Sequence, residues 1–295
     1  MPDEICLILH RKSANEQTVK EAVKTVRREG VDLRVRIPWN KRDKPRVVGE
    51  ALENGASRII AGGGDGTINA VASALVGDGS ERPAVTLGVM PLGTANDFAH
   101  GCGLPTEDLT ECLRIACTRE GRAIDVGKCN KRYFINVASA GFGAEITATT
   151  PVNLKKRLGG LAYSMMGLAK AFNLTPYRGE VRVPGEQPHV GQMLFMAVGN
   201  NHLAGGGFDV APAAKLDDGL LDVAALLHRP NPDLAQVARE LKDPLNPGNE
   251  YVYYKQLAEF TIKAEHKLHC NLDGEPVHKK TLRFAVLPRH LRLAY

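Results

Sequence analysis

Short runs of β-branched residues alternate with amphipathic segments through residues 1–120, and this alternation restricts the fold more than any other feature of the chain. Strands are expected at residues 5–9, 33–37, 58–61 and 85–90, and helices at residues 19–26, 47–52, 68–75 and 109–116. Strands that alternate with helices form a mainly parallel sheet with helices on both faces. The sequence therefore predicts an α/β domain in the N-terminal part.

After residue 121 the pattern changes to many short strands separated by turns. Strands are expected at residues 124–126, 133–138, 180–183, 193–198, 220–225, 260–264, 268–272 and 282–287, and helical spacing is confined to residues 154–172 and 233–241. A chain of 295 residues is about twice the length of a usual domain. We therefore predict an α/β domain at residues 1–122 and a β-rich, sandwich-like domain at residues 123–295, with the return of the last strand to the first domain left open.

The composition excludes several classes of protein. With 43% hydrophobic and 24% charged residues, the chain is neither disordered nor fibrous. A net charge of +5 and an aromatic content of 5% give no sign of a nucleic-acid-binding surface, so no nucleic acid partner is expected. The six cysteines form no C-x-x-C pair and the first residues do not resemble a signal peptide. We therefore expect a cytoplasmic protein with reduced thiols.

A glycine-rich turn, GGGDGT at residues 62–67, separates the third expected strand from the helix that follows it. Glycines let a ligand approach the backbone, and the N–H groups at a helix N-terminus attract anions. The turn therefore predicts a phosphate site, with a structural turn as the alternative. It is not a P-loop, because the chain has no G-x-x-x-x-G-K-[ST], and Thr67 stands where the dinucleotide fingerprint needs its third glycine.

A second turn, PLGTANDF at residues 91–98, follows the next expected strand. Ligands in open α/β sheets bind at the carboxyl ends of strands, so both turns are expected to line one crevice. Thr94 and Asn96 could hydrogen-bond a phosphate or a ribose, and Asp65 and Asp97 could hold a cation through water. Each of these residues could equally be a turn residue or a helix cap.

The motifs GGGDGTIN and PLGTANDFA are followed by VGNN, AGGG, DDGLLD and LDGEP. In this order and spacing they resemble the diacylglycerol kinase catalytic-domain family, and in particular the YegS-like bacterial lipid kinases, over nearly the whole chain. The resemblance implies an ATP-dependent lipid kinase whose α/β domain binds the nucleotide and whose active site lies in the cleft between the two domains. The chain departs from the family at residues 10–13 and at Pro38, where relatives usually carry Asn with Gly or Pro and a Thr that contacts the nucleotide.

The resemblance also assigns roles to individual residues. The ATP phosphates and ribose are expected to contact Gly63, Gly64, Asp65, Gly66, Thr67, Ile68, Asn69 and Thr94. We expect Gly64 and Gly66 to lack a side chain either because phosphate approaches closely or because their φ is positive. A carboxylate of Asp273 or Glu275 would take the proton from the lipid hydroxyl, and the choice between the two stays open.

The resemblance further implies a magnesium ion held by the Asp218 carboxylate and the backbone carbonyls of Lys215 and Leu220, with Ca²⁺ as an alternative ion at the same site. A hairpin turn without an ion is the alternative reading of these residues. A second Mg²⁺ would arrive with ATP near Asp65 and Asp97.

The acceptor implied by the resemblance is a membrane lipid such as diacylglycerol, phosphatidylglycerol or a sphingoid base. We expect a peripheral, transient contact with the inner face of the membrane and see no sign of an obligate protein partner. The apolar stripe at residues 154–172, flanked by Lys155, Lys156 and Arg157, is the candidate contact, with an ordinary core helix as the alternative. An NAD kinase, which shares GGDGT, and a non-catalytic nucleotide-binding regulator are the alternative functions.

Overall fold

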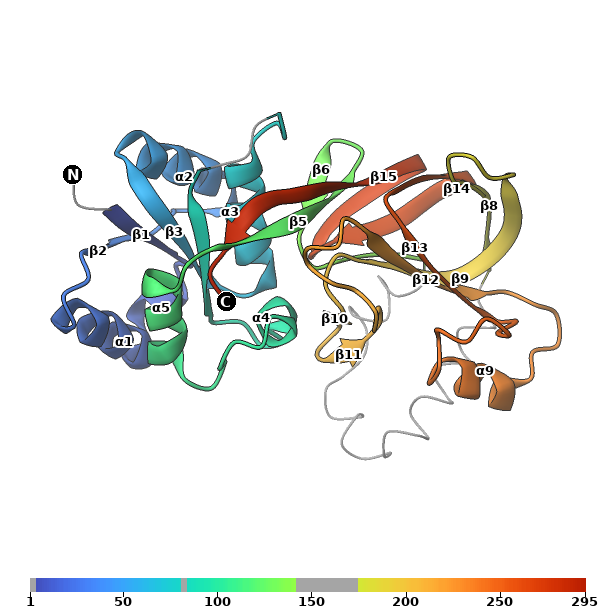
Figure 1. Cartoon of the computed structure of the whole chain (residues 1–295), viewed down its shortest axis with the longest axis horizontal. Coiled ribbons are helices and arrows are strands. Elements are labelled where there is room, and N and C mark those ends of the chain that lie inside the picture. Colours follow the sequence, from blue (N-terminus) through green and yellow to red (C-terminus); the bar gives the residue numbers. More distant parts are fainter. Residues whose placement is uncertain (1–3, 81–83, 142–174) are drawn as a thin grey trace.

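The computed structural model describes residues 4–80, 84–141 and 175–295. It has two halves, an N-terminal half rich in helices and a C-terminal half rich in strands, which are joined by strands that run from one into the other (Figure 1). The predicted combination of an α/β domain with a β-rich domain is confirmed. The stripe at residues 154–172 and its basic residues Lys155, Lys156 and Arg157 lie outside the described residues.

A parallel sheet forms the centre of the N-terminal half. Its strands are β1 (Glu4–Leu9), β2 (Leu33–Arg36), β3 (Ala56–Gly63) and β4 (Thr86–Pro91), in the order β2-β1-β3-β4. The helices are α1 (Gln17–Arg28), α2 (Lys44–Glu53), α3 (Asp65–Val76), α4 (Asp97–Gly101) and α5 (Leu109–Thr118), with short 3-10 turns η1 (Ser13–Asn15) and η2 (Lys41–Asp43). All strands and helices expected in this half are present.

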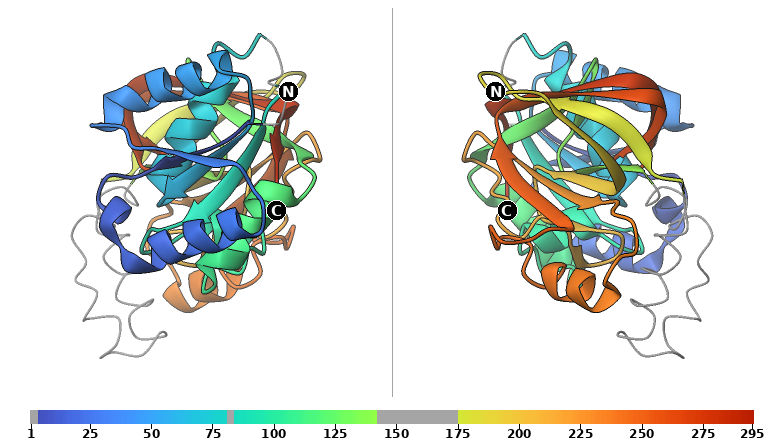
Figure 2. Two further views of the ribbon diagram at one scale, coloured as in Figure 1. Left: turned by 90° about the vertical axis from the view of Figure 1, so that its left-hand side faces the viewer. Right: turned by 90° about the vertical axis from the view of Figure 1, so that its right-hand side faces the viewer.

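The alternation of side chains along β1 explains why helices cover both faces of the sheet. Leu7 and Leu9 pack in one apolar cluster with α1 and α5, whereas Cys6 and Ile8 pack in another with α2 and α3. In the left view of Figure 2, α1 and α5 accordingly lie on one side of the parallel strands and α2 on the other. A sheet covered by helices on both faces is accessible to a ligand only at the ends of its strands.

The C-terminal half is built mainly from antiparallel strands. They are β5 (Arg122–Cys129), β6 (Arg132–Phe134), β7 (Val137–Gly141), β8 (Tyr177–Arg182), β9 (His189–Gly199), β12 (Leu221–Leu227), β13 (Val252–Leu257), β14 (Glu259–Leu272) and β15 (Glu275–Leu293), with a small β10 (Leu203–Ala204) and β11 (Phe208–Asp209) hairpin and helix α9 (Leu234–Glu240). Their inner faces form a second core, in which the rings of Phe260 and Phe284 stack with centroids 4.9 Å apart.

The last strand, β15, runs through both halves. It pairs in antiparallel fashion with β14 and β5, and then its residues Arg292 and Leu293 pair in parallel with Thr86 and Leu87 of β4. The two halves therefore share one continuous sheet in the order β13-β12-β9-β7-β14-β15-β4-β3-β1-β2.

Several elements differ from those expected. The single strand expected at residues 133–138 is broken into β6 and β7, whereas the strands expected at 260–264 and 268–272 form one strand, β14, with a shift in register between Lys263 and Leu268. The sequence did not predict α4, β13 or the β10–β11 hairpin. All six cysteines are free. Among the helices of the described segments, none combines the length and apolarity needed to cross a membrane.

Candidate functional site

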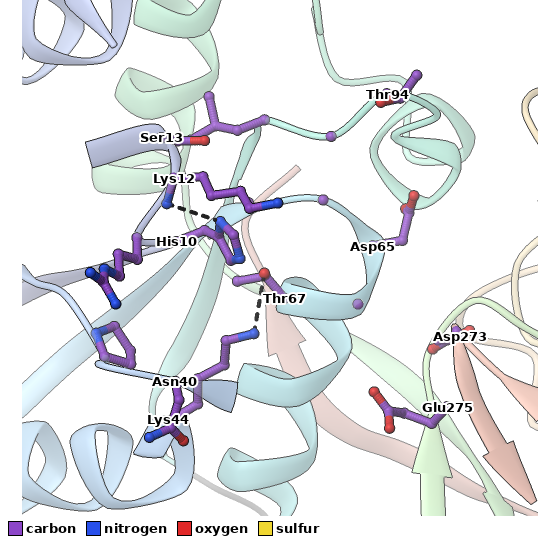
Figure 3. A pocket seen from close by; sticks show the side chains of 18 of the residues that line it. His10, Lys12, Ser13, Asn40, Lys44, Asp65, Thr67, Thr94, Asp273 and Glu275 are labelled. Carbon is purple, nitrogen blue, oxygen red and sulfur yellow. Dashed lines mark hydrogen bonds between the residues drawn. The ribbon is translucent and has the colours of Figure 1, made fainter. Parts of the chain in front are cut away.

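A cavity of about 700 Å³ opens at the carboxyl ends of β1, β3 and β4 and receives side chains from both halves (Figure 3). It is lined by His10, Arg11, Lys12, Ser13, Pro38, Trp39, Asn40, Lys44, Gly63, Gly64, Asp65, Gly66, Thr67, Leu92, Gly93, Thr94, Asp273, Gly274 and Glu275. The two glycine turns thus line one crevice, as the sequence predicts. Residues 273–275, which connect β14 to β15, bring the C-terminal half into the same cavity.

The two glycine turns touch each other through their backbones. The N–H of Leu92 donates to the carbonyl of Gly63 at 3.0 Å. A Cβ added to Gly93 would lie 2.6 Å from the Cα of Gly64, which is closer than real Cβ contacts allow. Glycine at these two positions is therefore required for the turns to meet.

The φ angles of the first turn exclude one of the two alternative reasons for its glycines. Neither Gly64, whose φ is −80°, nor Gly66 has a positive φ, so a left-handed conformation does not explain either glycine. A Cβ on Gly63 would lie 2.6 Å from the Thr67 side chain, whereas a Cβ on Gly66 would find only the Asp273 carbonyl oxygen, at 4.0 Å. A side chain at Gly66 would therefore not clash with the rest of the protein, and its absence leaves space in the pocket.

Six of the residues expected to bind nucleotide lie at the cavity, namely Gly63, Gly64, Asp65, Gly66, Thr67 and Thr94. Ile68 and Asn69 do not line it. Ile68 is fully buried in the apolar core, and Oδ1 of the buried Asn69 accepts a hydrogen bond of 3.3 Å from Ser73. Asn96 supports the second turn, because its Oδ1 accepts the N–H of Gly93 at 2.7 Å.

Basic side chains lie on one side of the glycine turn. In Figure 3, His10, Lys12 and Lys44 approach the turn from this side, and Lys44 Nζ donates a 3.3 Å hydrogen bond to Thr67 Oγ1. Burial, followed by the positive charges of Lys44 and Lys12, lowers the pKa of His10, whose Nδ1 accepts the backbone N–H of Lys12 at 3.3 Å. At the edge of the cavity, the Arg11 guanidinium lies 5.8 Å from the ring centre of Trp39.

Of these residues, Lys44 was missed by the sequence analysis. It is buried on the same face of α2 as Val47, Val48 and Ala51. A lysine in phase with the apolar positions of a helix was the signal that could have revealed it, because lysine is rarely buried without a charged or polar partner.

Carboxylates lie on the other side of the turn, where Figure 3 shows Asp65, Asp273 and Glu275. Burial is the main cause that raises the pKa of Asp65, and the nearby charge of Asp97 adds to it. Burial also raises the pKa of Asp273 to about 7, although three backbone N–H groups lower it. The cavity therefore has a basic side and an acidic side, with the glycine turn between them.

The structure distinguishes the two carboxylates of the β14–β15 turn. Both oxygens of Asp273 face the break between β6 and β7, where they accept hydrogen bonds from the N–H groups of Ile135 at 2.7 Å, Asn136 at 3.2 Å and Val137 at 2.9 Å. Asp273 also has a φ of +47°, which few residues other than glycine adopt. Its carboxylate therefore holds the turn in place, whereas the side chain of Glu275 points into the cavity (Figure 3).

A chain of hydrogen bonds connects the first glycine turn with the C-terminal half. Asp65 accepts the N–H of Phe98 at 3.0 Å, at the start of α4. The buried carboxylate of Asp97, also in α4, accepts the N–H groups of Gly206 and Gly207 in the β10–β11 hairpin at 2.9 and 2.7 Å. Gly206 and Gly207 have φ angles of +87° and +90°, so only glycine presents both N–H groups in this way without strain.

The residues expected to hold magnesium, Lys215, Asp218 and Leu220, lie on the loop before β12. Oδ1 of the exposed Asp218 accepts the N–H of Leu220 at 3.0 Å. The same loop is hydrogen-bonded to Asp125, because Oδ2 of Asp125 accepts the N–H of Gly219 at 2.7 Å.

The charge around this loop fits a hard cation. Burial is the main cause that raises the pKa of Asp125, and the charges of Asp218 and Asp217 add to it, so negative charge accumulates here. The described segments contain no group of three or more His, Cys, Asp and Glu side chains that could hold a metal. A cation at this loop would therefore depend on backbone carbonyl oxygens and water beside the Asp218 carboxylate, which is a usual arrangement for Mg²⁺.

Two family models match the chain. The diacylglycerol kinase catalytic domain matches residues 4–129, and the YegS C-terminal NAD kinase beta sandwich-like domain matches residues 136–295. A Chromohalobacter salexigens protein named "Probable lipid kinase YegS-like" is 46% identical over 290 residues, which cover 98% of this chain and 92% of that protein.

Solved structures share the fold. The crystal structure of a diacylglycerol kinase from Bacillus anthracis has a TM-score of 0.75 and 19% identity, over 100% of this chain and 98% of that one. An NAD kinase from Archaeoglobus fulgidus in complex with ATP has a TM-score of 0.52 and 14% identity, over 98% and 93% of the two chains. At these identities the likeness supports the fold alone.

Proposed function

The chain is a kinase of the YegS-like lipid kinase family, and on this premise we propose that it transfers the γ-phosphate of ATP to the hydroxyl group of a membrane lipid. The observation that carries the proposal is the opposite charge on the two sides of the cavity, with the glycine turn between them. The phosphate chain of ATP would lie along the turn, because backbone N–H groups and nearby lysines favour anions there.

The reaction would take place on the acidic side of the cavity. The hydroxyl oxygen of the lipid would bond to the γ-phosphorus while the bond from that phosphorus to the β–γ bridging oxygen breaks, so that ADP leaves. The hydroxyl proton would pass to the carboxylate of Glu275, which lines the cavity. Asp273 would act as a positioning residue, because its oxygens are held by the backbone of residues 135–137.

Metal ions would support this arrangement in two places. Mg²⁺ that arrives with ATP would neutralise charge on the β- and γ-phosphates, and Asp65, which lines the cavity, would receive it through water. Mg²⁺, or Ca²⁺ in its place, would be held at the second site by Asp218 and the carbonyls of Lys215 and Leu220, where negative charge accumulates.

The acceptor would be a lipid with a free hydroxyl group, such as diacylglycerol or phosphatidylglycerol, reached by transient contact with the inner face of the membrane. The net charge of +5 supports contact with an anionic surface, and such contact would weaken as the salt concentration rises. Sedimentation with vesicles that contain or lack anionic lipid, at low and high salt, tests this part of the proposal.

Transfer of labelled γ-phosphate from ATP tests the function directly. The protein would be incubated with Mg²⁺ and vesicles that contain diacylglycerol or phosphatidylglycerol, and separately with NAD. A labelled lipid that the Glu275→Gln variant does not form supports the proposal. Labelled NADP would instead favour an NAD kinase, and ATP binding without any labelled product would favour a non-catalytic regulator.

A further inference from the structure

Trp39 is the only tryptophan of the chain, and its ring lies largely in water although it lines the cavity. The residue is 76% exposed. An indole carries a large apolar surface, and removal of that surface from water is favourable. Because the protein leaves this ring uncovered at the edge of the cavity, a ligand that covers it would gain free energy from the contact.

The backbone holds Trp39 in a fixed position. The preceding residue, Pro38, is buried, and the N–H of Trp39 donates to Oδ2 of Asp43 at 3.1 Å. The other carboxylate oxygen of Asp43 accepts a 2.7 Å hydrogen bond from Nε of Arg46 in α2. The segment that carries the indole is thus anchored to α2, so a ligand that binds to the ring loses little affinity to the ordering of this segment.

Aromatic side chains are rare in the cavity. Of the described residues that line it, only Trp39 and His10 are aromatic, and most of the others are glycine, polar or charged. The guanidinium of Arg11, 5.8 Å from the centre of the Trp39 ring, also lines the cavity. A flat apolar ring beside a planar cation is suited to the π-face of a nucleobase.

The proposed function determines the direction of a nucleotide in the cavity. The γ-phosphate would lie beside Glu275, which would accept the hydroxyl proton, and the rest of the phosphate chain would lie along the glycine turn. Figure 3 shows Asn40, the residue after Trp39, across the glycine turn from Glu275. A nucleotide placed in this way has its base at the end of the cavity where Trp39 lies.

We propose that the indole of Trp39 stacks on the base of ATP and is a specificity-determining residue for a purine nucleotide. This inference rests on the proposed function, because it takes ATP as the phosphate donor. The gain from stacking increases with the apolar area that the two rings cover. A purine, with two rings, should therefore bind more tightly than a pyrimidine, whereas a phosphate chain without a base gains nothing from the indole.

The fluorescence of the wild-type protein gives a direct test, because Trp39 is its only tryptophan. We expect ATP and adenosine to change the intensity of the tryptophan emission, and inorganic triphosphate to leave it unchanged. A parallel titration of free tryptophan corrects for light absorbed by the nucleotide. If calorimetry detects ATP binding and the emission does not change, the inference is wrong.

Substitutions test the stacking through affinity, measured by calorimetry. Trp39→Ala removes the ring, and Trp39→Phe keeps a smaller one. Ile37→Ala is the matched control, because Ile37 is 49% exposed in the same segment and does not line the cavity. We expect Trp39→Ala to weaken ATP binding about tenfold and triphosphate binding less than twofold, and Ile37→Ala to change neither. Trp39→Phe should recover part of the ATP affinity, and the preference for ATP over CTP should decrease in Trp39→Ala.

Unchanged ATP affinity in Trp39→Ala would overturn the inference. An equal loss of affinity for ATP and for triphosphate would also overturn it, because the ring would then only support the shape of the cavity. In lipid phosphorylation, KM for ATP should rise in Trp39→Ala by a larger factor than kcat falls, since the ring lies away from the reacting atoms. If the wild type phosphorylates lipid and Trp39→Ala keeps the same KM for ATP, only the inference fails; if the wild type does not bind ATP, the proposed function fails as well.

Discussion

Oδ1 of Asp97 accepts a 2.7 Å hydrogen bond from the backbone N–H of Gly207, a residue 110 positions further along the chain. Asp97 lies near the end of the second glycine turn and begins α4, whereas Gly207 lies in the β10–β11 hairpin of the C-terminal half. The two halves are thus joined beside the cavity by a buried carboxylate. We expect this contact to help align the glycine turns with the β14–β15 turn.

Removal of that carboxylate should loosen the junction of the two halves. Asp97→Ala leaves the N–H groups of Gly206 and Gly207 without their acceptor, and we expect the free energy of unfolding to fall by about 1.5–3 kcal/mol. Urea denaturation followed by circular dichroism measures this change. Asp32→Ala, at an exposed position, is the control and should be neutral. An equal effect of both substitutions would contradict the structural role of Asp97.

Substitution of the two carboxylates of the β14–β15 turn should have different effects on activity and on stability. Glu275→Gln should lower kcat by about 10²–10⁴-fold with the melting temperature and ATP affinity unchanged, because it removes only the proposed base. Asp273→Asn should lower the melting temperature, because an amide group would face the N–H donors of residues 135–137. An active Glu275→Gln variant would show that the proton goes elsewhere.

Asp273 should make stability depend on pH. Its pKa is about 7 in the folded protein and about 4 in the unfolded chain, so the folded state binds more protons between these values. Its contribution is fully present below about pH 4 and is lost as the pH rises through about 7, by up to about 4 kcal/mol. Urea denaturation between pH 5 and pH 8 should show this loss in the wild type and not in Asp273→Asn. The same dependence of the free energy of unfolding on pH in the two proteins would contradict this role of Asp273.

Gly66 and Gly93 should respond differently to alanine. At Gly66 a methyl group finds open space in the first turn of α3, so Gly66→Ala should keep or raise the melting temperature, by helix propensity, while it lowers ATP affinity at least about tenfold. At Gly93 the methyl group meets the backbone of Gly64, so Gly93→Ala should lower the melting temperature. Thermal unfolding and calorimetry distinguish the two effects. Unchanged ATP affinity in Gly66→Ala would show that the phosphate chain does not bind at this turn.

Magnesium should stabilise the protein through the loop before β12. We expect Mg²⁺ to raise the melting temperature of the wild type in the absence of ATP, because an ion bound only to the folded state shifts the unfolding equilibrium. In Asp218→Ala this increase should disappear, whereas Asp65→Ala, at the cavity, should retain it. If Asp218→Ala responds to Mg²⁺ like the wild type, the ion does not bind at this loop.

The sequence predicts the N-terminal half well because each helix there has one buried face. In α1 the buried residues Val19, Ala22, Val23 and Val26 recur at helical spacing, and local periodicity is enough to find such a helix. The glycine turns are predictable for a related reason, since both follow strands and face the same end of the sheet.

Elements that depend on distant partners could not be predicted. The break between β6 and β7 exists because the backbone there donates to Asp273, which lies 138 positions from Ile135. Likewise, nothing close to Asp97 in the sequence shows that it binds Gly206 and Gly207. Lys44 stands in a segment rich in charged residues, so the sequence suggests an exposed side chain, although Lys44 lies on the buried face of α2.

The pairing of β15 with β4 determines when the N-terminal sheet can be completed during synthesis of the chain. Residues 292–293, which lie beside β4, leave the ribosome about 200 residues after β4 itself. During most of synthesis one edge of the first sheet therefore stays open to other strands, and such edges invite wrong pairing. The N-terminal half, although it is made first, can complete its sheet only when the last strand arrives.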